Sequence, residues 1–427
     1  MIVTSQPPPP WDRSISPIEN GGGTVSTHVF TSAAMNYLPK LRLLCESIRR
    51  YHPEFVVHLA LADDAPDAEE RVGPIVDDVI RIKDLQIPNE RSWIFRHSVV
   101  ELSCALKPFV VRHLLRKGCD GNILYFDPDI VLFSRLDDLL DEFRSASILL
   151  TPHVTVPEVT LDGVMCNEID SLQHGVFNLG FIGIANDAHG QALADWWAQR
   201  SYHFCADDAD MGLFNDQKWV NLVPIFFEGV KILRDTRYNV APWNLSARKV
   251  EGSFAEGFVV DGSPMGFYHF TGFDSGGHRI MMHKFAGHNG ATHELLNWYE
   301  RSSASTERAG ARRWAYGVFS NGAPITRAHR VVYRKRADLQ NRYPDPFDSA
   351  PRSSYYEWFK HHAALEYPTL IEQRPFWRAM SSLWRFAWSY GSILVSDPRY
   401  GEEVLRRAWR VLHAEGYGGV QRRLLSK

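Results

Sequence analysis

The stretch that decides the fold runs from residue 123 to residue 133 and reads Ile-Leu-Tyr-Phe-Asp-Pro-Asp-Ile-Val-Leu-Phe. Its apolar run predicts a buried parallel strand, and two carboxylates, Asp127 and Asp129, follow at the end of that run. Burying one ionised carboxylate is costly, and two side by side also repel each other. A divalent cation would stabilise both, and oxygen ligands favour Mg²⁺ or Mn²⁺, which commonly carry substrate phosphates. The alternative is that both aspartates only open a turn, and this short motif alone does not decide between the two.

Composition limits the class of protein. A chain of 427 residues is too long for one compact core, so we expect two domains. A hydrophobic content of 44% with 23% charged residues is typical of a globular protein in water, and a net charge of −3 argues against a nucleic-acid partner. No apolar run approaches the roughly 18 residues that would cross a bilayer.

The cysteines indicate a reducing compartment. They are five, an odd number, and they are widely spaced without a Cys-x-x-Cys pair. This pattern fits neither a disulfide framework nor a zinc site, so we expect free thiols and a cytoplasmic protein. The N-terminus carries Pro7 to Pro10 and no apolar signal core. Residues 1–23 are therefore predicted to be a disordered lead-in.

Strands and helices alternate through the first part of the chain. Hydrophobic periodicity predicts strands at 24–31, 56–62, 78–82 and the 123–133 stretch, with helices at 36–51 and 100–116. This alternation favours an α/β fold with a parallel sheet, and ligands bind such sheets beyond the carboxyl ends of the strands. Asp63, Asp64, Asp127 and Asp129 fall at such ends. Further strands at 148–150, 176–184, 230–233 and 266–270, with a helix at 188–202, make the sheet mixed, and residues 24–290 form one predicted domain.

Residues 291–427 are predicted to be a helical accessory region, because strand signals mostly stop there. The region is rich in Arg and aromatic residues, and one helical face is shared by Trp377, Met380, Trp384 and Trp388. Such a helix either packs on the catalytic domain, with arginine stems covering apolar surface, or makes peripheral contact with the inner face of a membrane. The sequence leaves both alternatives open.

Six segments in a fixed order carry a family resemblance. They span residues 30–37 (FTSAAMNY), 105–108 (ALKP), 126–129 (FDPD), 177–180 (FNLG), 216–217 (DQ) and 268–272 (YHFTG). Across roughly residues 25–290 the chain resembles the retaining glycosyltransferases of the GT-A fold, specifically the family 8 type that includes glycogenin and bacterial lipopolysaccharide galactosyltransferases. The resemblance implies a Rossmann-like mixed sheet and transfer of a sugar from a nucleoside diphosphate donor, most simply a UDP-sugar, to an acceptor hydroxyl.

The resemblance also implies a metal and diphosphate site. Asp127 and Asp129 would hold the cation, with His269 as third ligand, although a His in an aromatic strand is often only a core residue. Lys107 would meet the diphosphate or sugar hydroxyls, and the alternative is a solvated helix lysine. Gly272 would let the backbone approach the phosphates closely.

The remaining site residues concern the nucleotide and the sugar. The turn after the first strand would offer Thr31, Ser32 and Asn36 to base and ribose, unless Ser32 and Asn36 only cap the next helix. Three further side chains would lie near the sugar, namely Asn178, Asp216 as a partner of sugar hydroxyls, and Gln217 under the anomeric carbon. A neutral amide is a poor nucleophile, so the leaving phosphate would accept the acceptor's proton with retention of configuration.

The chain departs from the family pattern after Gly272. The family continues with a Lys-Pro-Trp segment, whereas residues 272–279 read GFDSGGHR, so its phosphate-binding lysine has no clean counterpart. His278, Arg279 and Lys284 are the candidates to replace it. The segment from Pro152 to Gln173 is expected to be a loop over the active site.

Other functions use similar residues. A glycoside hydrolase also needs two carboxylates but no metal, and a nucleotidyltransferase shares the α/β setting and the cation but releases pyrophosphate. A non-catalytic module would bind the donor without turnover. We expect a glycosyltransferase whose acceptor is a growing cell-surface polysaccharide or a lipid-linked saccharide.

Overall fold

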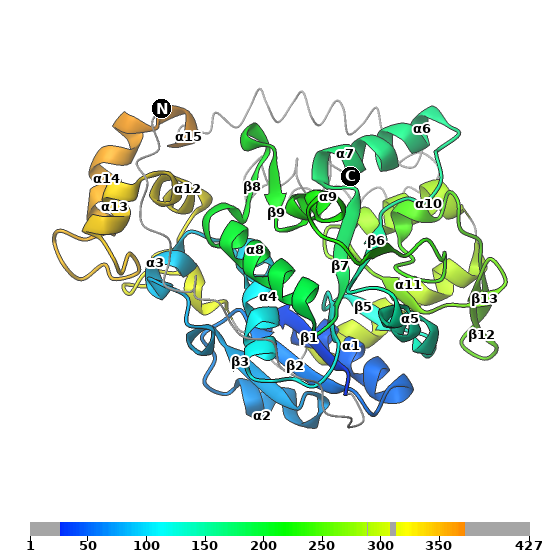
Figure 1. The fold of residues 1–427 in the computed structure, drawn as a ribbon. Coiled ribbons are helices and arrows are strands. Elements are labelled where there is room, and N and C mark those ends of the chain that lie inside the picture. Colours follow the sequence, from blue (N-terminus) through cyan, green and yellow to red (C-terminus); the bar gives the residue numbers. More distant parts are fainter. Residues whose placement is uncertain (1–25, 288, 308–312, 372–427) are drawn as a thin grey trace.

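The computed structural model describes residues 26–287, 289–307 and 313–371 (Figure 1). At its centre lies a seven-stranded sheet in the order β10-β6-β7-β4-β1-β2-β3. Strand β7 runs antiparallel to β4 and β6, and the other neighbours are parallel, so the predicted mixed α/β sheet is confirmed. The strand bounds are β1 His28–Ala33, β2 Val56–Leu61, β3 Asp78–Arg81, β4 Ile123–Phe126, β6 Ile148–Pro152, β7 Phe177–Ile184 and β10 Val230–Ile232.

Helices cover both faces of this sheet. Helices α4 (Val99–Arg116) and α8 (Ala188–Phe204) pack together over one face, and α1 (Leu38–Tyr51) covers the other. Helix α4 begins where predicted because Ser98 and Glu101 form a capping box, each accepting a hydrogen bond from the backbone N–H of the other. The smaller elements are α2 Ala68–Val72, α3 Glu90–Phe95, α5 Asp137–Asp141, β8 Ala206–Asp208, β9 Leu213–Asn215, α9 Val223–Phe226, β11 Val250–Ser253, β12 Gly257–Val260 and β13 Ser263–Pro264.

The turn after the first strand begins later than predicted. Strand β1 continues to Ala33, so Thr31 and Ser32 are strand residues, and a 3₁₀ turn at Met35–Tyr37 leads into α1. The prediction that Ser32 and Asn36 cap this helix is wrong. The caps of the turn and of α1 are Ala34 and Tyr37, and neither makes a side-chain capping bond.

The 123–133 stretch forms two strands rather than the single strand expected. Strand β4 ends at Phe126, and β5 (Ile130–Leu132) leaves the central sheet to pair antiparallel with β14 (Phe267–His269). His269 lies directly opposite Ile130 in this pairing. The two aspartates therefore occupy the branch point between two sheets, within reach of a residue that is distant in sequence.

Residues 161–174 of the segment between β6 and β7 are helical, whereas residues 153–160 form neither helix nor strand, so the prediction of a loop is wrong for the second part of the segment. It contains α6 (Leu161–Gly163), a π-helical turn (Val164–Glu168) and α7 (Ile169–His174). The side chain of Thr160 accepts a hydrogen bond from Gly163 N and starts the first turn. The long connection is thus a short helical arm beside the carboxyl end of the sheet (Figure 1).

The C-terminal part of the described chain is helical, in α10 (Gly277–Ala286), α11 (Gly290–Glu307), α12 (Arg327–Lys335), α13 (Ala337–Arg342), α14 (Tyr355–Glu366) and α15 (Pro368–Ile371). The ring of Phe95 packs against Tyr333 of α12 and Tyr355 of α14 at 5.1 and 5.4 Å between centroids, so these two helices share the core of the sheet. The buried residues of α10 and α11 belong to a separate cluster that includes β14. The predicted lead-in at 1–23 and the face from Trp377 to Trp388 lie outside the described residues. None of the helices within the described ranges has the length and apolar character that crossing a bilayer requires.

Protein stability should fall in mild acid because His97 is buried. Burial, followed by the charge of Arg96, lowers the pKa of His97 to about 3. Between this value and the ordinary histidine pKa, the unfolded chain binds a proton that the folded chain excludes, so stability rises with pH. Going from pH 7 to pH 5 should cost about 2 kcal/mol at this residue. Urea unfolding at both pH values should show a pH effect smaller by that amount in His97→Gln, and an equal effect in both proteins would contradict the assignment.

Candidate active site

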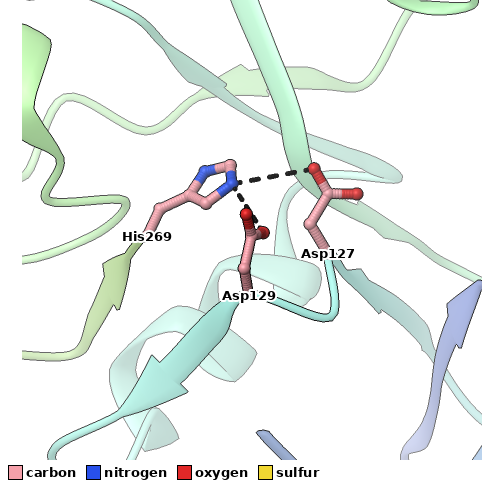
Figure 2. Close-up of side chains that lie close together, drawn as sticks. All are labelled: Asp127, Asp129 and His269. Atoms are coloured by element: carbon pink, nitrogen blue, oxygen red, sulfur yellow. Dashed lines mark ion pairs between the residues drawn. The ribbon is translucent and has the colours of Figure 1, made fainter. Parts of the chain in front are cut away.

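Three predicted metal ligands come together at the branch point. His269 Nε2 lies 3.1 Å from Asp129 Oδ1 and 3.7 Å from Asp127 Oδ2 (Figure 2). One ligand atom from each residue lies within 4.8 Å of the other two. Figure 2 shows the imidazole of His269, at the end of β14, pointing its Nε2 at both carboxylates. The predicted Asp127–Asp129–His269 cluster therefore exists in the folded chain.

The geometry of this cluster fits a divalent cation. Ligand atoms about 2.1 Å from an octahedral cation lie about 3 Å apart when adjacent and about 4.2 Å apart when opposite. The 3.1 Å spacing agrees with the adjacent value, and the 3.7 Å spacing lies between the two values. The His269 side chain is 3% exposed, whereas those of Asp129 and Asp127 are 16% and 29% exposed. The carboxylates thus leave an open side for a ligand. Burial opposes ionisation of Asp129, but His269 and then Lys40 outweigh it, and the pKa of Asp129 is lowered to about 2.

Gly180 on β7 makes room for His269. A Cβ added at Gly180 would lie 2.4 Å from His269 Cε1 and 2.7 Å from Asn178 Oδ1. On the other side, the edge of Trp243 contacts the His269 ring at 5.6 Å between centroids. The ring of His269 therefore occupies the space that a side chain at position 180 would fill, and packing between Gly180 and Trp243 fixes its orientation.

Gly180→Ala should displace His269. We expect at least a hundredfold loss of activity, since a shift of about 1 Å in a catalytic group can cost that much, and a stability loss of about 1–3 kcal/mol from overpacking. The matched control is Gly183→Ala on the same strand, whose added Cβ would meet Phe143 at 2.8 Å, away from the cluster. Mn²⁺ affinity should fall only in Gly180→Ala, and an unchanged affinity in that variant would refute the role of the gap.

Lys107 forms a buried ion-pair network beside the cluster. Its Nζ lies 3.6 Å from Asp127 Oδ1 and 3.4 Å from Asp216 Oδ2, and it donates a 3.0 Å hydrogen bond to Leu179 O. Burial opposes its charge, but Asp127 and then Asp216 outweigh burial and raise the pKa of Lys107. The residue is 2% exposed, so the alternative of a solvated helix lysine is wrong. Helix α4 packs on the sheet, and this packing aims Lys107 at the strand ends.

The paired Asp216 and Gln217 occupy different environments. Asp216 is 1% exposed, and burial raises its pKa while Lys107 opposes the rise. Gln217 bridges two elements: its Oε1 accepts from Leu179 N at 3.0 Å and its Nε2 donates to His174 O at 3.1 Å. These bonds hold the amide between β7 and α7. An amide oxygen has two lone pairs, so Gln217 Oε1 keeps the capacity to accept a second hydrogen bond.

Asn178 belongs to a buried polar network. Its Oδ1 accepts from Gly180 N and from Asn239 Nδ2, each at 3.0 Å, and its Nδ2 lies 3.1 Å from His153 Nε2. Asn239 is fully buried with φ +53°, a left-handed conformation that Asn tolerates better than most residues. The network holds the floor of the site rigid, and sequence patterns gave little sign of it because its members are far apart in the chain.

The predicted nucleotide-binding residues lie at the ends of β1 and β2. Thr31 and Ser32 are both 1% exposed, and as consecutive strand residues they point to opposite faces of the sheet. Both side chains are therefore buried, one on each face of the sheet, whereas Asn36 is exposed beyond the strand. Asp63 accepts hydrogen bonds from Met35 N at 3.3 Å and Ala315 N at 2.9 Å, so it organises the turn.

The segment at Trp314 and Ala315 contacts a part of the sheet that is distant in the sequence. In the structure Trp314 Nε1 donates a 2.8 Å hydrogen bond to Ala62 O, which places this segment against the tip of β2. The contact joins residues that are 252 positions apart. No local pattern could have revealed it.

The expected basic candidates after Gly272 all have partners in the structure. His278 is buried against Thr271 O and Tyr268, Arg279 pairs with Glu300, and Lys284 lies 3.1 Å from Asp162. A further lysine, Lys40 on α1, pairs with Asp274, which directly follows the Gly272-Phe273 turn. Tyr37 OH also donates to Asp274, at 3.0 Å. Gly272 itself has φ +70°, which explains its lack of a side chain.

The known proteins that are similar to this chain share little sequence identity with it. No family model matches the chain. The uncharacterized protein YfnD of Bacillus subtilis (strain 168) is 25% identical over 250 residues, covering 58% of this chain and 78% of that protein. YfnF of the same strain is 24% identical over 200 residues, covering 46% of this chain and 60% of that protein.

Three of the similar solved structures are glycosyltransferases. The galactosyltransferase LgtC, in complex with donor and acceptor sugar analogs, is 16% identical with a TM-score of 0.38, covering 67% of this chain and 100% of that chain. Mouse xyloside xylosyltransferase 1 is 16% identical with a TM-score of 0.36, covering 58% and 98%. The bifunctional glycosyltransferase WbbM is 13% identical with a TM-score of 0.39, covering 68% and 51%. Similarity at this level leaves the activity to be argued from the site.

Proposed function

We propose that this protein is a metal-dependent glycosyltransferase that moves a sugar from a nucleoside diphosphate donor to an acceptor hydroxyl. The observation that carries the proposal is the Asp127–Asp129–His269 cluster at the carboxyl edge of a mixed α/β sheet. The buried Lys107–Asp216 pair directly beside the cluster adds the fixed charges that a reaction centre needs. The order of sequence segments shared with retaining family 8 enzymes supports the same function.

Asp127, Asp129 and His269 would hold the cation. Carboxylate ligands suit Mg²⁺ and Mn²⁺, and the added imidazole favours Mn²⁺ of the two. When bound, the cation neutralises negative charge that grows on the departing diphosphate. His269 Nδ1 has no hydrogen-bond partner among the described residues, so the ring is oriented by packing against Gly180 and Trp243.

Lys40 is the side chain that we assign to the donor phosphates in place of the missing family lysine. Its ammonium group lies at the Gly272 to Asp274 turn, and its charge contributes to the lowered pKa of Asp129. Gly272 would bring its backbone to the same phosphates. Lys40→Met should raise KM for the donor at least tenfold with a smaller effect on kcat, as measured by initial rates at varied donor concentration. An effect on kcat alone would contradict this assignment.

The sugar would lie over Asn178, Asp216 and Gln217. In the proposed step, the bond between the anomeric carbon and the phosphate oxygen breaks, the acceptor oxygen bonds to the same face of that carbon, and the acceptor's proton passes to the departing phosphate. Gln217 would stabilise the positive charge on the sugar through its amide oxygen. Proton NMR of the product should show a retained anomeric configuration, and an inverted anomer would refute this step.

UDP is the proposed nucleotide, with base and ribose near Thr31, Ser32 and Asn36. The proposed acceptor is a saccharide or lipid-linked saccharide of the cell surface, reached from the cytoplasm at the inner face of the membrane. The nucleotide follows from the family resemblance, and the cytoplasmic location follows from the cysteine pattern.

A donor screen tests the proposal. UDP-sugars with Mn²⁺ should raise the melting temperature of the protein, and the best one should be slowly hydrolysed to UDP. EDTA and Asp129→Asn should remove both effects. Failure of every nucleotide sugar to stabilise the protein would count against the proposal. Metal-independent cleavage of a glycoside would instead indicate a hydrolase, and release of pyrophosphate would indicate a nucleotidyltransferase.

A further inference from the structure

An apolar surface lies on the helical arm between β6 and β7. Half of the exposed large apolar side chains among the described residues, seven of fourteen, belong to residues 156–176. Val159, Leu161 and Leu172 are 96%, 75% and 69% exposed. We call this set the β6–β7 stripe, and its members are Val156, Val159, Leu161, Met165, Ile169, Leu172 and Val176. Single exposed apolar residues are ordinary, but a concentration of this kind marks an interaction site.

Four members of the stripe lie on one side of the helical arm. Leu161, Met165, Ile169 and Leu172 follow each other at intervals of four, four and three residues along α6, the π-helical turn and α7, which is the spacing of one helical side. The side chains of these four residues are exposed. Another residue of the arm, His174, contacts the rest of the protein. The ring of His174 contacts Phe214 of β9 at 4.5 Å between centroids, and Gln217 donates to His174 O.

Neighbouring elements extend the apolar surface. Helix α7 contacts β9, and both β9 and α9 contact the 3₁₀ turn that begins at Gln217. Figure 1 shows α7, β9 and α9 grouped at the same edge of the molecule. The turn between β8 and β9 exposes Met211 by 60%, and α9 exposes Ile225 by 75% and Phe226 by 55%. The surface is therefore wider than the arm itself.

Charge decides what kind of partner fits this surface. Residues 156–176 contain four acidic side chains and no Lys or Arg, which gives a net charge of −4. Among the described residues, Lys284 pairs with one of these carboxylates from outside the segment, its Nζ lying 3.1 Å from Asp162 Oδ2. An anionic lipid surface would be repelled by such a segment. A partner that is both apolar and basic is the complementary choice.

The chain itself contains such a partner after α15, which ends at Ile371. Residues 372–427 contain nine Arg and one Lys against five acidic residues, a net charge of +5. Their apolar content includes Trp377, Trp384, Trp388 and Trp409. Even at the rise of a helix these 56 residues would extend about 80 Å, which exceeds the roughly 50 Å width of a compact body of this size. The segment is long enough to reach the stripe from Ile371.

We propose that residues 372–427 dock on the β6–β7 stripe, with apolar residues on the stripe and arginines toward its acidic side chains. The docked segment would cover Ile169 and Leu172 of α7, the helix whose last residue, His174, accepts a hydrogen bond from Gln217. It would thereby hold the wall of the candidate active site in place. The proposal does not depend on which reaction the site performs.

Hydrogen–deuterium exchange of the full chain tests this interaction. Met165→Lys/Leu172→Lys places two positive charges on the stripe, and Val100→Lys is the control at a 51% exposed apolar residue of α4. We expect amides of residues 372–427 to exchange at least tenfold faster in the double variant. They should be unchanged in the control, and amides of β1, β4 and β7 should be unchanged in both. If the amides of β1, β4 and β7 also exchange faster in Met165→Lys/Leu172→Lys, the measurement is repeated with the variant Val159→Lys/Leu161→Lys.

Three outcomes would overturn the proposal. The first is an equal exchange rate of residues 372–427 in the wild type and in the stripe variants. The second is protection of the stripe that disappears on dilution together with a fall from dimer to monomer mass in light scattering, which would identify a second copy as the occupant. The third is protection that arises only when vesicles containing phosphatidylglycerol are added, which would identify a membrane.

Discussion

Asp129→Asn should reduce sugar transfer and donor hydrolysis by about 10³-fold, equivalent to about 4 kcal/mol of transition-state stabilisation. Asp129 Oδ1 is 3.1 Å from His269 Nε2, and the other carboxylate, Asp127, lies two residues earlier on the same branch point. Asparagine keeps the shape of the side chain but removes the negative charge that a cation requires. Initial rates with Mn²⁺ and the best UDP-sugar measure the effect.

The same substitution should leave the fold intact. In the metal-free chain, the substitution loses the favourable charge contacts with His269 and Lys40 that lower the pKa of Asp129. We expect the free energy of unfolding in EDTA at pH 7 to fall by about 2 kcal/mol. The control is Asp141→Asn on α5, whose side chain is 60% exposed and which should keep full activity. Activity above a tenth of wild type in Asp129→Asn would contradict the account.

Lys107→Met should destabilise the protein by about 3–5 kcal/mol, because it removes the cation from a buried ion pair. Asp216 would then be left 1% exposed without its partner, with the second carboxylate of Asp127 nearby. Urea unfolding in EDTA at pH 7 measures the loss. The control is Lys117→Met at the exposed end of α4, where a change within about 0.5 kcal/mol is expected.

The double variant Lys107→Met/Asp216→Asn separates charge from packing. Because Asn removes the buried charge that methionine leaves unpaired, we expect the double variant to recover at least about 2 kcal/mol relative to Lys107→Met. Both variants should be inactive, since Asp216 is placed at the sugar. A loss below 1 kcal/mol in Lys107→Met, or no recovery in the double variant, would show that the pair does not hold the strand ends together.

Sequence patterns predicted the central sheet well because its elements are defined locally. The strands at β2, β3 and β7 and the helices α1, α4 and α8 have clear apolar periodicity, and their observed bounds differ from the predicted ones by only a few residues. The capping box at Ser98 is also a local signal. Local patterns failed where distant segments decide the structure. The split into β4 and β5 depends on β14, which lies more than 130 residues later.

In the candidate site, too, features that depend on local sequence patterns were predicted, and features that depend on distant segments were not. The Asp127–Asp129–His269 cluster followed from the aspartate motif and from a family resemblance that pointed to His269. The contact of Lys40 with Asp274 was not predicted, because it joins α1 to a turn 234 residues away. The hydrogen bond from Ala315 N to Asp63 was not predicted either, because the two residues are 252 positions apart. The arm at 152–173 was predicted as a loop because its apolar residues face outward instead of marking a buried face.

Titration of the protein with Mn²⁺, followed by the electron paramagnetic resonance signal of the free ion, tests whether the Asp127–Asp129–His269 cluster binds the metal. With UDP present, we expect one bound Mn²⁺ per wild-type chain and at least thirtyfold weaker binding in Asp129→Asn, with Asp141→Asn unchanged. Equal Mn²⁺ binding by the wild type and Asp129→Asn would show that the Asp127–Asp129–His269 cluster is not the metal site, and the proposed function would lose its main support.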